Sequence, residues 1–354
     1  MRCGAIQYQV RYSSVPYEYP YRYGIGIRYT KVKQAQILLK CWRHSVALIT
    51  PAPAVRRVGP SVFQGHMDDD GSPAIWESDD VEMVIVDAGC CEFRAGFAAD
   101  EGPSVTRNAC DRHSEHVWRD VLAELEVDLS TVAMVLTEPP GTSAADRATI
   151  AAILFTTLHV RALFFLPPPL GVAYGTDTMT GVVVDVGQRS TTIWAVYEGY
   201  NVLGAATTVP VGAGHQTDWL QARLQELGLQ PGSDDEGERM AREAKEAHAV
   251  VALDYAKRKK GKPVSIAQPD GTSLSVPADE WTRCGEGLLQ PQLIGLSAEV
   301  PGLMRALVET ISLTAHPVQD ALYTNVRLAG GGSMLNGLAE RLQKELTQVR
   351  APDR

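Results

Sequence analysis

Two aspartates stand at matching places in the chain, each directly after a short run of β-branched residues. Asp87 lies in Val84-Ile-Val-Asp-Ala-Gly89, and Asp185 lies in Val182-Val-Val-Asp-Val-Gly187. Each run predicts a buried strand, and the small residue and glycine that follow predict a tight turn. A carboxylate at such a strand end offers the hard oxygen ligands that a hydrated Mg²⁺ prefers. One such turn is common in any hairpin, but the repeat indicates two related lobes facing each other.

A glycine-rich element further along the chain has the pattern of an anion site. Val326–Ala329 is expected to be a strand, Gly330-Gly-Gly-Ser333 a loop, and residues 338–346 a helix with apolar positions at helical spacing. Glycine lets the backbone come close to a ligand, and the free N–H groups and dipole of a helix start favour phosphate. A single glycine-rich loop is often only a tight connection between a strand and a helix. The prediction of an anion site here therefore depends on the two aspartate segments that accompany the loop.

The elements that must position these residues begin near residue 67. From there, short apolar runs alternate with amphipathic stretches, the pattern of an α/β protein. Residues 1–66 differ, because they hold ten Lys or Arg against the single acid Glu18, and seven of the twelve tyrosines. The remainder holds 23 bases against 41 acids. We expect residues 1–66 to be a basic, Tyr-rich, poorly ordered extension; binding to nucleic acid or an acidic partner is the alternative interpretation.

Composition narrows the class further. The six cysteines are few and irregularly spaced, which argues against a disulfide framework and favours a reducing setting. Cys110, His113 and His116 have the short spacing of metal ligands, but the sequence offers no second pair of ligands to complete a site. A metal site at these residues is therefore disfavoured. No apolar run approaches the roughly 20 residues that cross a bilayer. We therefore expect no membrane contact.

Taken together, these segments resemble the actin family, and more distantly the sugar-kinase and heat-shock-chaperone ATPases of the same fold. Asp87-Ala-Gly-Cys-Cys-Glu-Phe-Arg-Ala-Gly-Phe97 resembles the first phosphate hairpin of that family. Four further segments follow in the family's order: Leu136-Thr-Glu-Pro-Pro140, Tyr197-Glu-Gly-Tyr200, Arg283-Cys-Gly-Glu-Gly-Leu-Leu-Gln-Pro291 and Leu328-Ala-Gly-Gly-Gly-Ser-Met-Leu-Asn-Gly337. The resemblance begins near Met67-Asp-Asp-Asp, which looks like an actin start. Residues 1–66 would then be an added extension or an untranslated upstream reading.

The resemblance implies a bilobal fold of two related βα lobes around a nucleotide cleft, with residues 67–175 and 176–354 as the lobes. ATP or ADP with Mg²⁺ would be the ligand, and Asp87 and Asp185 would hold the metal through water. The residues implied to contact the nucleotide are Asp87, Gly89, Cys90, Arg94, Asp185, Gly187, Lys245, Glu246, Gly330, Gly331 and Met334. Arg94 stands at a lysine position of the family. Taken alone, Lys245 and Glu246 would be read as part of a solvated helix face.

Several positions depart from the family pattern inside the cleft. Cys91 replaces a glycine of the first phosphate loop, and Gln188 and Arg189 replace an acid and a glycine of the second. A side chain there would crowd the phosphates, although Arg189 would also be able to contact them. Ala152 stands at the glutamine that positions the attacking water, and Thr192 at a supporting histidine. Because neither can orient that water, we expect weak or absent ATP hydrolysis and no catalytic residue.

Two further departures concern the fold. Only a short polar stretch joins Gly102-Pro103 to Trp118, where the family has the outer domain of the first lobe. The chain also stops before the segment that returns to complete that lobe. We therefore expect no ordinary filaments, and a divergent actin-related protein that serves as an ATP-binding structural subunit of a cytoskeletal or other multi-protein assembly.

The sequence leaves other functions open. An active ATPase or kinase of the same superfamily and a degenerate fragment without a nucleotide site are the alternatives. Protein partners are expected, actin or other actin-related proteins among them, whereas nucleic acid is disfavoured. The expected location is the cytoplasm and cytoskeleton. The basic run Lys257-Arg-Lys-Lys-Gly-Lys262 keeps the nucleus as an alternative, although a solvated loop before the hairpin at residues 264–276 explains it more simply.

Overall fold

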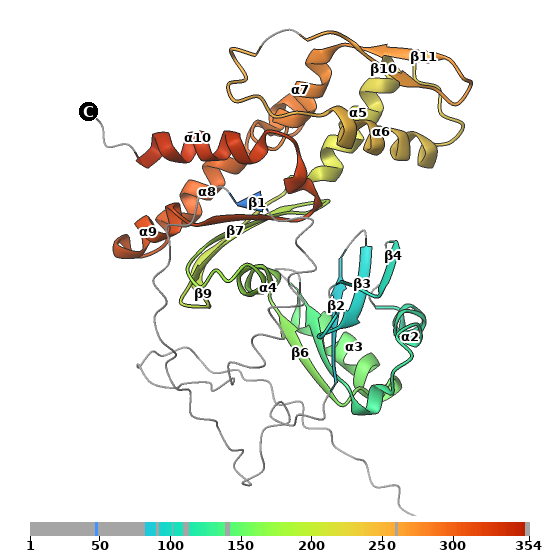
Figure 1. Ribbon diagram of the computed structural model, residues 1–354, viewed down its shortest axis with the longest axis vertical. Helices are drawn as coiled ribbons and strands as arrows, with labels where there is room; N and C mark the ends of the chain where they lie inside the picture. The colour runs from blue at the N-terminus through green and yellow to red at the C-terminus, as the bar shows by residue number, and fades with distance from the viewer. Residues whose placement is uncertain are drawn as a thin grey trace, which may run out of the picture.

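The computed structural model builds the chain from two five-stranded mixed sheets, a separate hairpin and the helices that cover them (Figure 1). It describes residues 47–48, 82–89, 92–100, 102–108, 113–138, 142–258 and 261–350. The α/β class predicted from the sequence is confirmed. The expected extension at residues 1–66 lies outside the described residues, except for the two-residue strand β1 (Ala47–Leu48).

The first lobe is built on a sheet of strand order β4-β3-β2-β5-β6. Its strands are β2 (Met83–Ala88), β3 (Glu92–Phe97), β4 (Val105–Asn108), β5 (Ala133–Thr137) and β6 (Ala162–Leu166). β2 and β3 form an antiparallel hairpin, while β2, β5 and β6 run parallel. This mixed sheet gives β2 a central position, so its carboxyl end lies where parallel strands present ligands.

Helices α2 (Glu115–Ala123) and α3 (Ala144–Ala152) accompany this sheet, with turns at Leu129–Thr131 and Ile153–Thr157. α2 buries Trp118, Val121 and Leu122, which share one face because they are three and four residues apart. The Trp118 ring meets Phe93 of β3 edge-on, with centroids 4.9 Å apart. β4 ends at Asn108 and α2 begins at Glu115, so the link between them is short.

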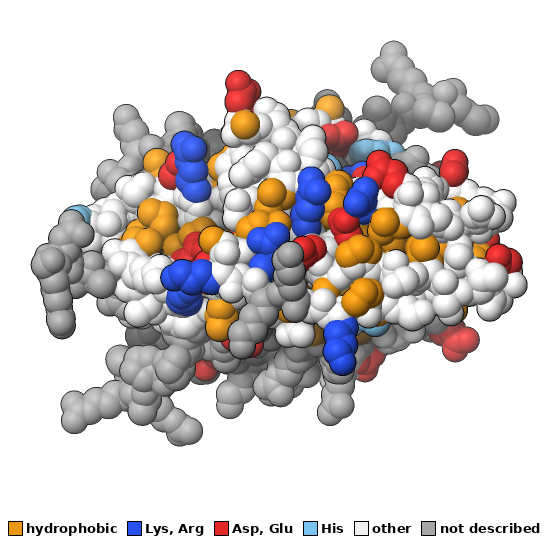
Figure 2. Space-filling view, turned by 90° about the horizontal axis from the view of Figure 1, so that it is seen from above, with side chains coloured by type: hydrophobic (Ala, Val, Ile, Leu, Met, Phe, Trp, Pro, Cys, Tyr) orange, Lys and Arg blue, Asp and Glu red, His pale blue; other side chains and the backbone are white. Residues whose placement is uncertain are grey.

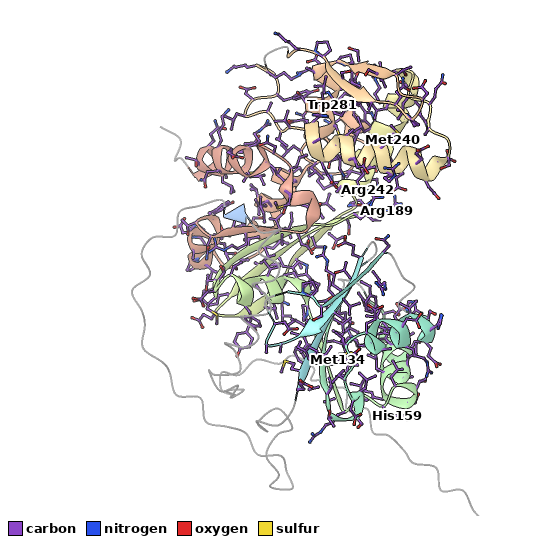
Figure 3. All side chains as sticks on the ribbon, turned by 45° about the vertical axis from the view of Figure 1, so that its right-hand side comes forward. Met134, His159, Arg189, Met240, Arg242 and Trp281 are labelled. Carbon is purple, nitrogen blue, oxygen red and sulfur yellow. The ribbon has the colours of Figure 1, made fainter. Side chains whose placement is uncertain are left out.

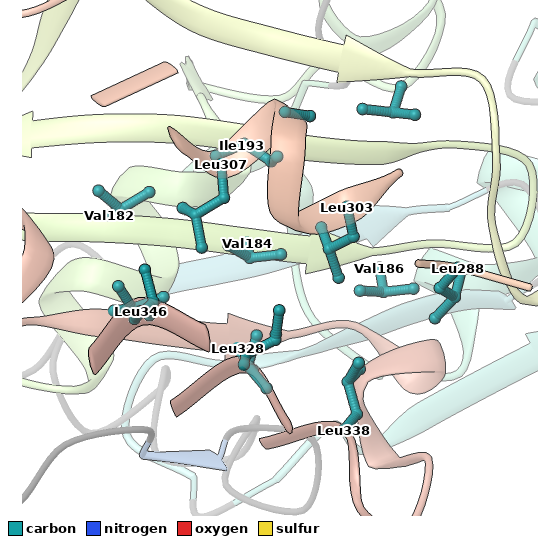
Figure 4. Packing of buried hydrophobic residues seen from close by; sticks show 14 of the residues in the cluster. Val182, Val184, Val186, Ile193, Leu288, Leu303, Leu307, Leu328, Leu338 and Leu346 are labelled. Carbon is teal, nitrogen blue, oxygen red and sulfur yellow. The ribbon is translucent and has the colours of Figure 1, made fainter. Parts of the chain in front are cut away.

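The second lobe carries a sheet of order β1-β12-β7-β8-β9. Its main strands are β7 (Gly181–Val186), β8 (Thr191–Tyr197), β9 (Tyr200–Val209) and β12 (Val326–Ala329), and its helices are α4 (Pro168–Gly175), α8 (Leu303–Ser312), α9 (His316–Tyr323) and α10 (Leu338–Arg350). One core joins valines of β7 to leucines of β12, α8 and α10 (Figure 4). α4 packs on the other face of this sheet through Val172 and Ala173, although its residues fall within the range 67–175 expected for the first lobe.

A third group of elements lies beyond this sheet, at the top of Figure 1. It comprises α5 (Ala213–Glu226), α6 (Asp234–His248), α7 (Ala278–Glu286), the hairpin β10 (Val264–Ala267) with β11 (Ser273–Val276), and the short turn Pro291–Ile294. The short turn Gly331–Met334 lies instead between β12 and α10 and contacts β7. The core of the third group contains Leu220, Leu224, Trp281 and Cys284. The hairpin occupies the expected residues 264–276.

The two sheets repeat one arrangement. In each, a central strand forms an antiparallel hairpin with the next strand and lies beside a parallel strand on its other side: β2 between β3 and β5, and β7 between β8 and β12. The repeat expected from the two aspartate segments is therefore a repeat of structure. The strand, loop and helix expected at residues 326–346 are present, with α10 extending to Arg350.

Candidate functional site

The two aspartates occupy equivalent places on equivalent hairpins. Asp87 is next to last in β2, and Asp185 is next to last in β7. The N–H of Gly89 donates to the Glu92 carbonyl, and the N–H of Gly187 donates to the Ser190 carbonyl, both at 3.0 Å. Each turn is therefore closed by its glycine.

Their charges show that the two aspartates lie near each other. Burial and, to a smaller extent, the negative charge of Asp87 together raise the pKa of the Asp185 carboxyl from 3.8 to about 6. Burial also raises the pKa of Asp87, while the Thr137 hydroxyl, which donates to its Oδ1, and the Arg94 guanidinium oppose the rise. No donor to the Asp185 carboxylate is found among the described residues. The negative charge of Asp87 is thus partly compensated by a hydroxyl donor and a guanidinium of the first lobe, whereas no described residue compensates the charge of Asp185.

The glycine loop lies directly on the Asp185 strand. β12 runs parallel to β7, with Ala329 opposite Asp185. Gly330 has φ +80°, and a Cβ there would lie 2.3 Å from Asp185 Oδ1 and 2.5 Å from the Val186 carbonyl oxygen. Only glycine fits this place, because it combines a left-handed backbone with a close approach. A Cβ on Gly331 would meet no atom within 4 Å, so this residue faces open space.

The start of α5 supports the second hairpin from behind. The N–H groups of Ala213 and Gly214 donate to the carbonyls of Gly187 and Gln188, at 2.9 and 2.7 Å. These helix-start donors would otherwise be free to bind an anion. They instead fix the turn that follows Asp185.

Lys245 of α6 holds the start of α5 in place through two hydrogen bonds. Its side chain is buried, and its Nζ donates to the Ala213 carbonyl at 2.9 Å and to Thr217 Oγ1 at 2.8 Å. Burial lowers the pKa of the Lys245 ammonium. A solvated helix face therefore describes the exposed Glu246 but not Lys245.

Comparison with known proteins places this architecture. The actin family model matches residues 110–354. The chain is 32% identical over 249 residues to an "Actin-like protein" of Neurospora crassa, covering 68% of this chain and 64% of that protein. It is 28% identical over 243 residues to "Centractin" of Schizosaccharomyces pombe, covering 66% of this chain and 63% of that protein. The chain thus spans somewhat less than two thirds of the length of these relatives.

The chain belongs to the actin family. The matched residues include the Asp185 hairpin and the glycine loop but begin after the Asp87 hairpin. The Asp87 hairpin is related to the matched Asp185 hairpin by the repeated strand arrangement. The family membership predicted from the sequence is confirmed.

Gln188 and Arg189, which replace an acid and a glycine of the family pattern, lie in the turn that follows Asp185. Gln188 lies over the start of α5, because a Cβ on Gly214 would be 2.9 Å from its Nε2. Arg189 Nη1 pairs with Asp218 Oδ2 of α5 at 3.1 Å, and both side chains are exposed. Figure 3 shows Arg189 at the end of the second-lobe sheet nearest the first lobe. The ion pair holds Arg189 toward α5, so the structure gives it a partner other than a phosphate.

The remaining predicted site residues fall in different settings. Arg94 is directly opposite Asp87 in the β2–β3 register and also pairs with Glu92. Met334 ends the turn after the glycine loop, and its side chain is 58% exposed. Cys90 and the departing Cys91 lie outside the described residues.

Ala152 and Thr192, the two positions predicted to have lost hydrolytic residues, lie in different elements. Ala152 is the last residue of α3, is exposed, and is followed by a π turn at Ile153–Thr157. Such turns are frequent at functional sites. Thr192 is buried directly opposite Asp185 in the β7–β8 register. Thr192 is thus the counterpart of Arg94, and a neutral residue stands where the first lobe has a cation.

Thr137 was not among the predicted site residues, although its hydroxyl binds Asp87. It stands in Leu136-Thr-Glu-Pro-Pro140, a segment quoted above only for its resemblance. The signal available was a threonine at the end of a buried strand parallel to the Asp87 strand. Parallel strands bring such ends to one edge of the sheet.

The donor set fits a hydrated divalent cation. Two carboxylates approach each other, and one of them has no hydrogen-bond donor among the described residues. Mg²⁺ usually keeps several waters and is held by one or two carboxylates together with substrate phosphates. The described residues contain no cluster of three or more potential metal ligands.

Proposed function

We propose that this actin-family chain binds ATP or ADP with Mg²⁺ between Asp87 and Asp185. The observation that carries the proposal is the pair of matching hairpins, with the glycine loop laid on the Asp185 carboxylate. Asp87 and Asp185 would hold the waters of the metal, and the open face at Gly331 leaves room for a ligand. Lys245 would act by fixing the start of α5 behind the second hairpin.

The proposed function is binding without efficient hydrolysis. The bound metal would supply charge stabilisation to the phosphates. Hydrolysis also needs a group that orients the attacking water, and neither the methyl of Ala152 nor the buried hydroxyl of Thr192 does so. The chain would therefore hold a nucleotide as a structural ligand and serve as a subunit of a cytoskeletal or other multi-protein assembly. It would not form ordinary filaments, because of the short link between β4 and α2.

Protein partners, including actin or other actin-related proteins, are the proposed binding class, in the cytoplasm and cytoskeleton. No helix among the described residues is long and apolar enough to cross a membrane. Two side chains of the basic run, which would favour the nucleus, have partners within the chain. Lys257 pairs with Asp254, and the Arg258 guanidinium lies 3.9 Å from the centre of the Tyr255 ring. In the face shown in Figure 2, Lys and Arg side chains are scattered among acidic and apolar ones.

Thermal melting of the full chain with and without Mg-ATP tests nucleotide binding. A ligand that binds the native state alone stabilises it by about 2.7 kcal/mol at a hundred times its Kd. Millimolar Mg-ATP should raise the Tm of the wild type and of the control Glu299→Gln, but not that of Asp185→Asn. No shift in the wild type would favour a degenerate chain without a nucleotide site.

Two further assays separate the remaining alternatives. Phosphate release at the rate of conventional actin would favour an active ATPase and refute the loss of hydrolysis. Sedimentation of nucleotide-loaded chain as helical polymers would refute the absence of ordinary filaments. The expected results are no significant phosphate release and a chain that stays in the supernatant.

A further inference from the structure

The sheet of the second lobe contains a strand from far outside the family match. β1 (Ala47–Leu48) pairs antiparallel with β12, with Ala47 opposite Leu328 and Leu48 opposite Arg327. The family match begins only at residue 110. Figure 4 shows β1 as the blue strand on the side of β12 away from β7. β12 is therefore an internal strand, although no strand of the matched region lies on that side of it in the described structure.

The burial of β12 is a second sign that its outer edge is covered. All four of its residues are buried, and the charged Arg327 is only 6% exposed. The edge strand β4 instead exposes three of its four residues, and the edge strand β9 exposes five of its ten. An open strand edge presents unpaired N–H and C=O groups, which native proteins cover or pair. β12 has the burial of a strand with neighbours on both sides.

β12 also leads directly into the candidate site. Arg327 and Leu328, the two residues that pair with β1, stand just before Gly330, which rests on the Asp185 carboxylate. A strand held by ladders on both sides has fewer conformations available than one held on a single side. The β1 ladder therefore restricts the loop that lies on the site.

We propose that the segment carrying Ala47 and Leu48 is an intramolecular clamp strand. It completes the sheet of the second lobe and holds the glycine loop against Asp185, so it forms part of the nucleotide-binding lobe. The effect on nucleotide affinity rests on the proposed function. The strand pairing does not, and it is tested without nucleotide.

Hydrogen exchange in the full chain measures the clamp directly. Proline at both β1 positions, Ala47→Pro with Leu48→Pro, removes two N–H donors and disfavours the pairing. Exchange in peptides covering Val326–Ala329 should become about tenfold faster or more, as expected when a protecting ladder is lost. The matched control Ser13→Pro with Ser14→Pro, also within residues 1–66, should leave it unchanged. Unchanged exchange in the β1 variant would overturn the proposal.

A cysteine pair tests the same contact in a chain that keeps its ladder. Directly opposed strand residues are close enough for a disulfide, so Leu48→Cys with Arg327→Cys should crosslink on mild oxidation. Peptide mapping identifies the linkage, and Ser13→Cys with Arg327→Cys serves as the control that stays unlinked. Absence of the Leu48–Arg327 crosslink overturns the proposal. If amide exchange in the proline variant also becomes faster in β5, which lies in the other sheet, the variant is destabilised as a whole. The crosslinking result alone then tests the pairing of β1 with β12.

Nucleotide affinity then tests the link to the site. The proline variant at Ala47 and Leu48 should bind Mg-ATP about tenfold more weakly than the wild type, a difference of about 1.4 kcal/mol. An unchanged affinity would overturn the coupling between the clamp strand and the glycine loop. A wild type that binds no nucleotide would refute the proposed function, while the exchange and crosslinking results would still decide the clamp strand.

Discussion

Replacing Asp185 with asparagine should stabilise the nucleotide-free protein at neutral pH while removing its response to Mg-ATP. The amide has nearly the size of the carboxylate, so it fits beneath Gly330 without a new contact. In the wild type, burial and the charge of Asp87 raise the pKa of Asp185 from 3.8 to about 6. At about 1.4 kcal/mol for each unit of pKa, ionising this carboxyl in the folded protein costs up to about 3 kcal/mol.

The sign of the pH dependence follows from proton binding. Between 3.8 and about 6 the folded protein binds the Asp185 proton more tightly than the unfolded chain does. The stability of the wild type therefore falls as the pH rises through this range. At about pH 8 the wild type carries the whole cost, and the asparagine variant should be more stable by about 1–3 kcal/mol. At about pH 5 the difference should shrink, because the wild-type carboxyl is then largely protonated.

Urea denaturation followed by tryptophan fluorescence, without nucleotide, gives these free energies. Saturating Mg-ATP should reverse the order of stability of the two proteins, because the variant lacks one of the two carboxylates that we propose hold the metal. Asp218→Asn is the control: this carboxylate is exposed, and its removal should give no comparable pH-dependent difference. A variant at Asp185 that is less stable than the wild type at both pH values would refute the electrostatic reasoning.

Three further sets of substitutions test other parts of the molecule. Ala152→Gln, alone and with Thr192→His, should raise phosphate release about tenfold or more if water orientation is what is missing; no increase in a chain that binds Mg-ATP would show a different defect. Gly330→Ala should cost about 1–3 kcal/mol in urea denaturation, because its φ is +80° and its Cβ would lie 2.3 Å from a carboxylate oxygen. Arg327 Nε donates to Thr178 Oγ1 at 2.7 Å, while its Nη1 lacks a partner among the described residues. Thr178→Val should therefore destabilise by about 1–3 kcal/mol, whereas Arg327→Met should be neutral or stabilising; the opposite order would show that the guanidinium is compensated.

The parts of the fold that could be predicted are those with a local signature. The strand at Val326–Ala329 has the predicted bounds, because an apolar run is followed by glycines that cannot extend it. The turns after Asp87 and Asp185 could be predicted because a glycine closes each of them. Their facing arrangement was inferred from the repeat and from the family resemblance.

The parts that could not be predicted depend on contacts between distant segments. Ala213 donates its backbone N–H to Gly187, and a backbone donor has no residue-type signature. Lys245 is buried because its partners, among them Thr217, come from another helix, and a charged residue alone predicts exposure. The pairing of Leu48 with Arg327 crosses most of the chain.

The two aspartate hairpins share a glycine-closed turn but differ in the charges that surround the aspartate. Asp87 has Arg94 opposite and a hydroxyl donor, while Asp185 has only the neutral Thr192 opposite. In the proposed function a hydrated cation would supply the counter-charge at Asp185, and nucleotide phosphates would be further ligands of that cation. The proposed binding would then use groups that the chain has, whereas hydrolysis would need a water-orienting group that the methyl side chain of Ala152 cannot supply. Nucleotide that co-purifies with the full chain should accordingly be the triphosphate, and chromatography of the released nucleotide would contradict this if it recovered mainly ADP.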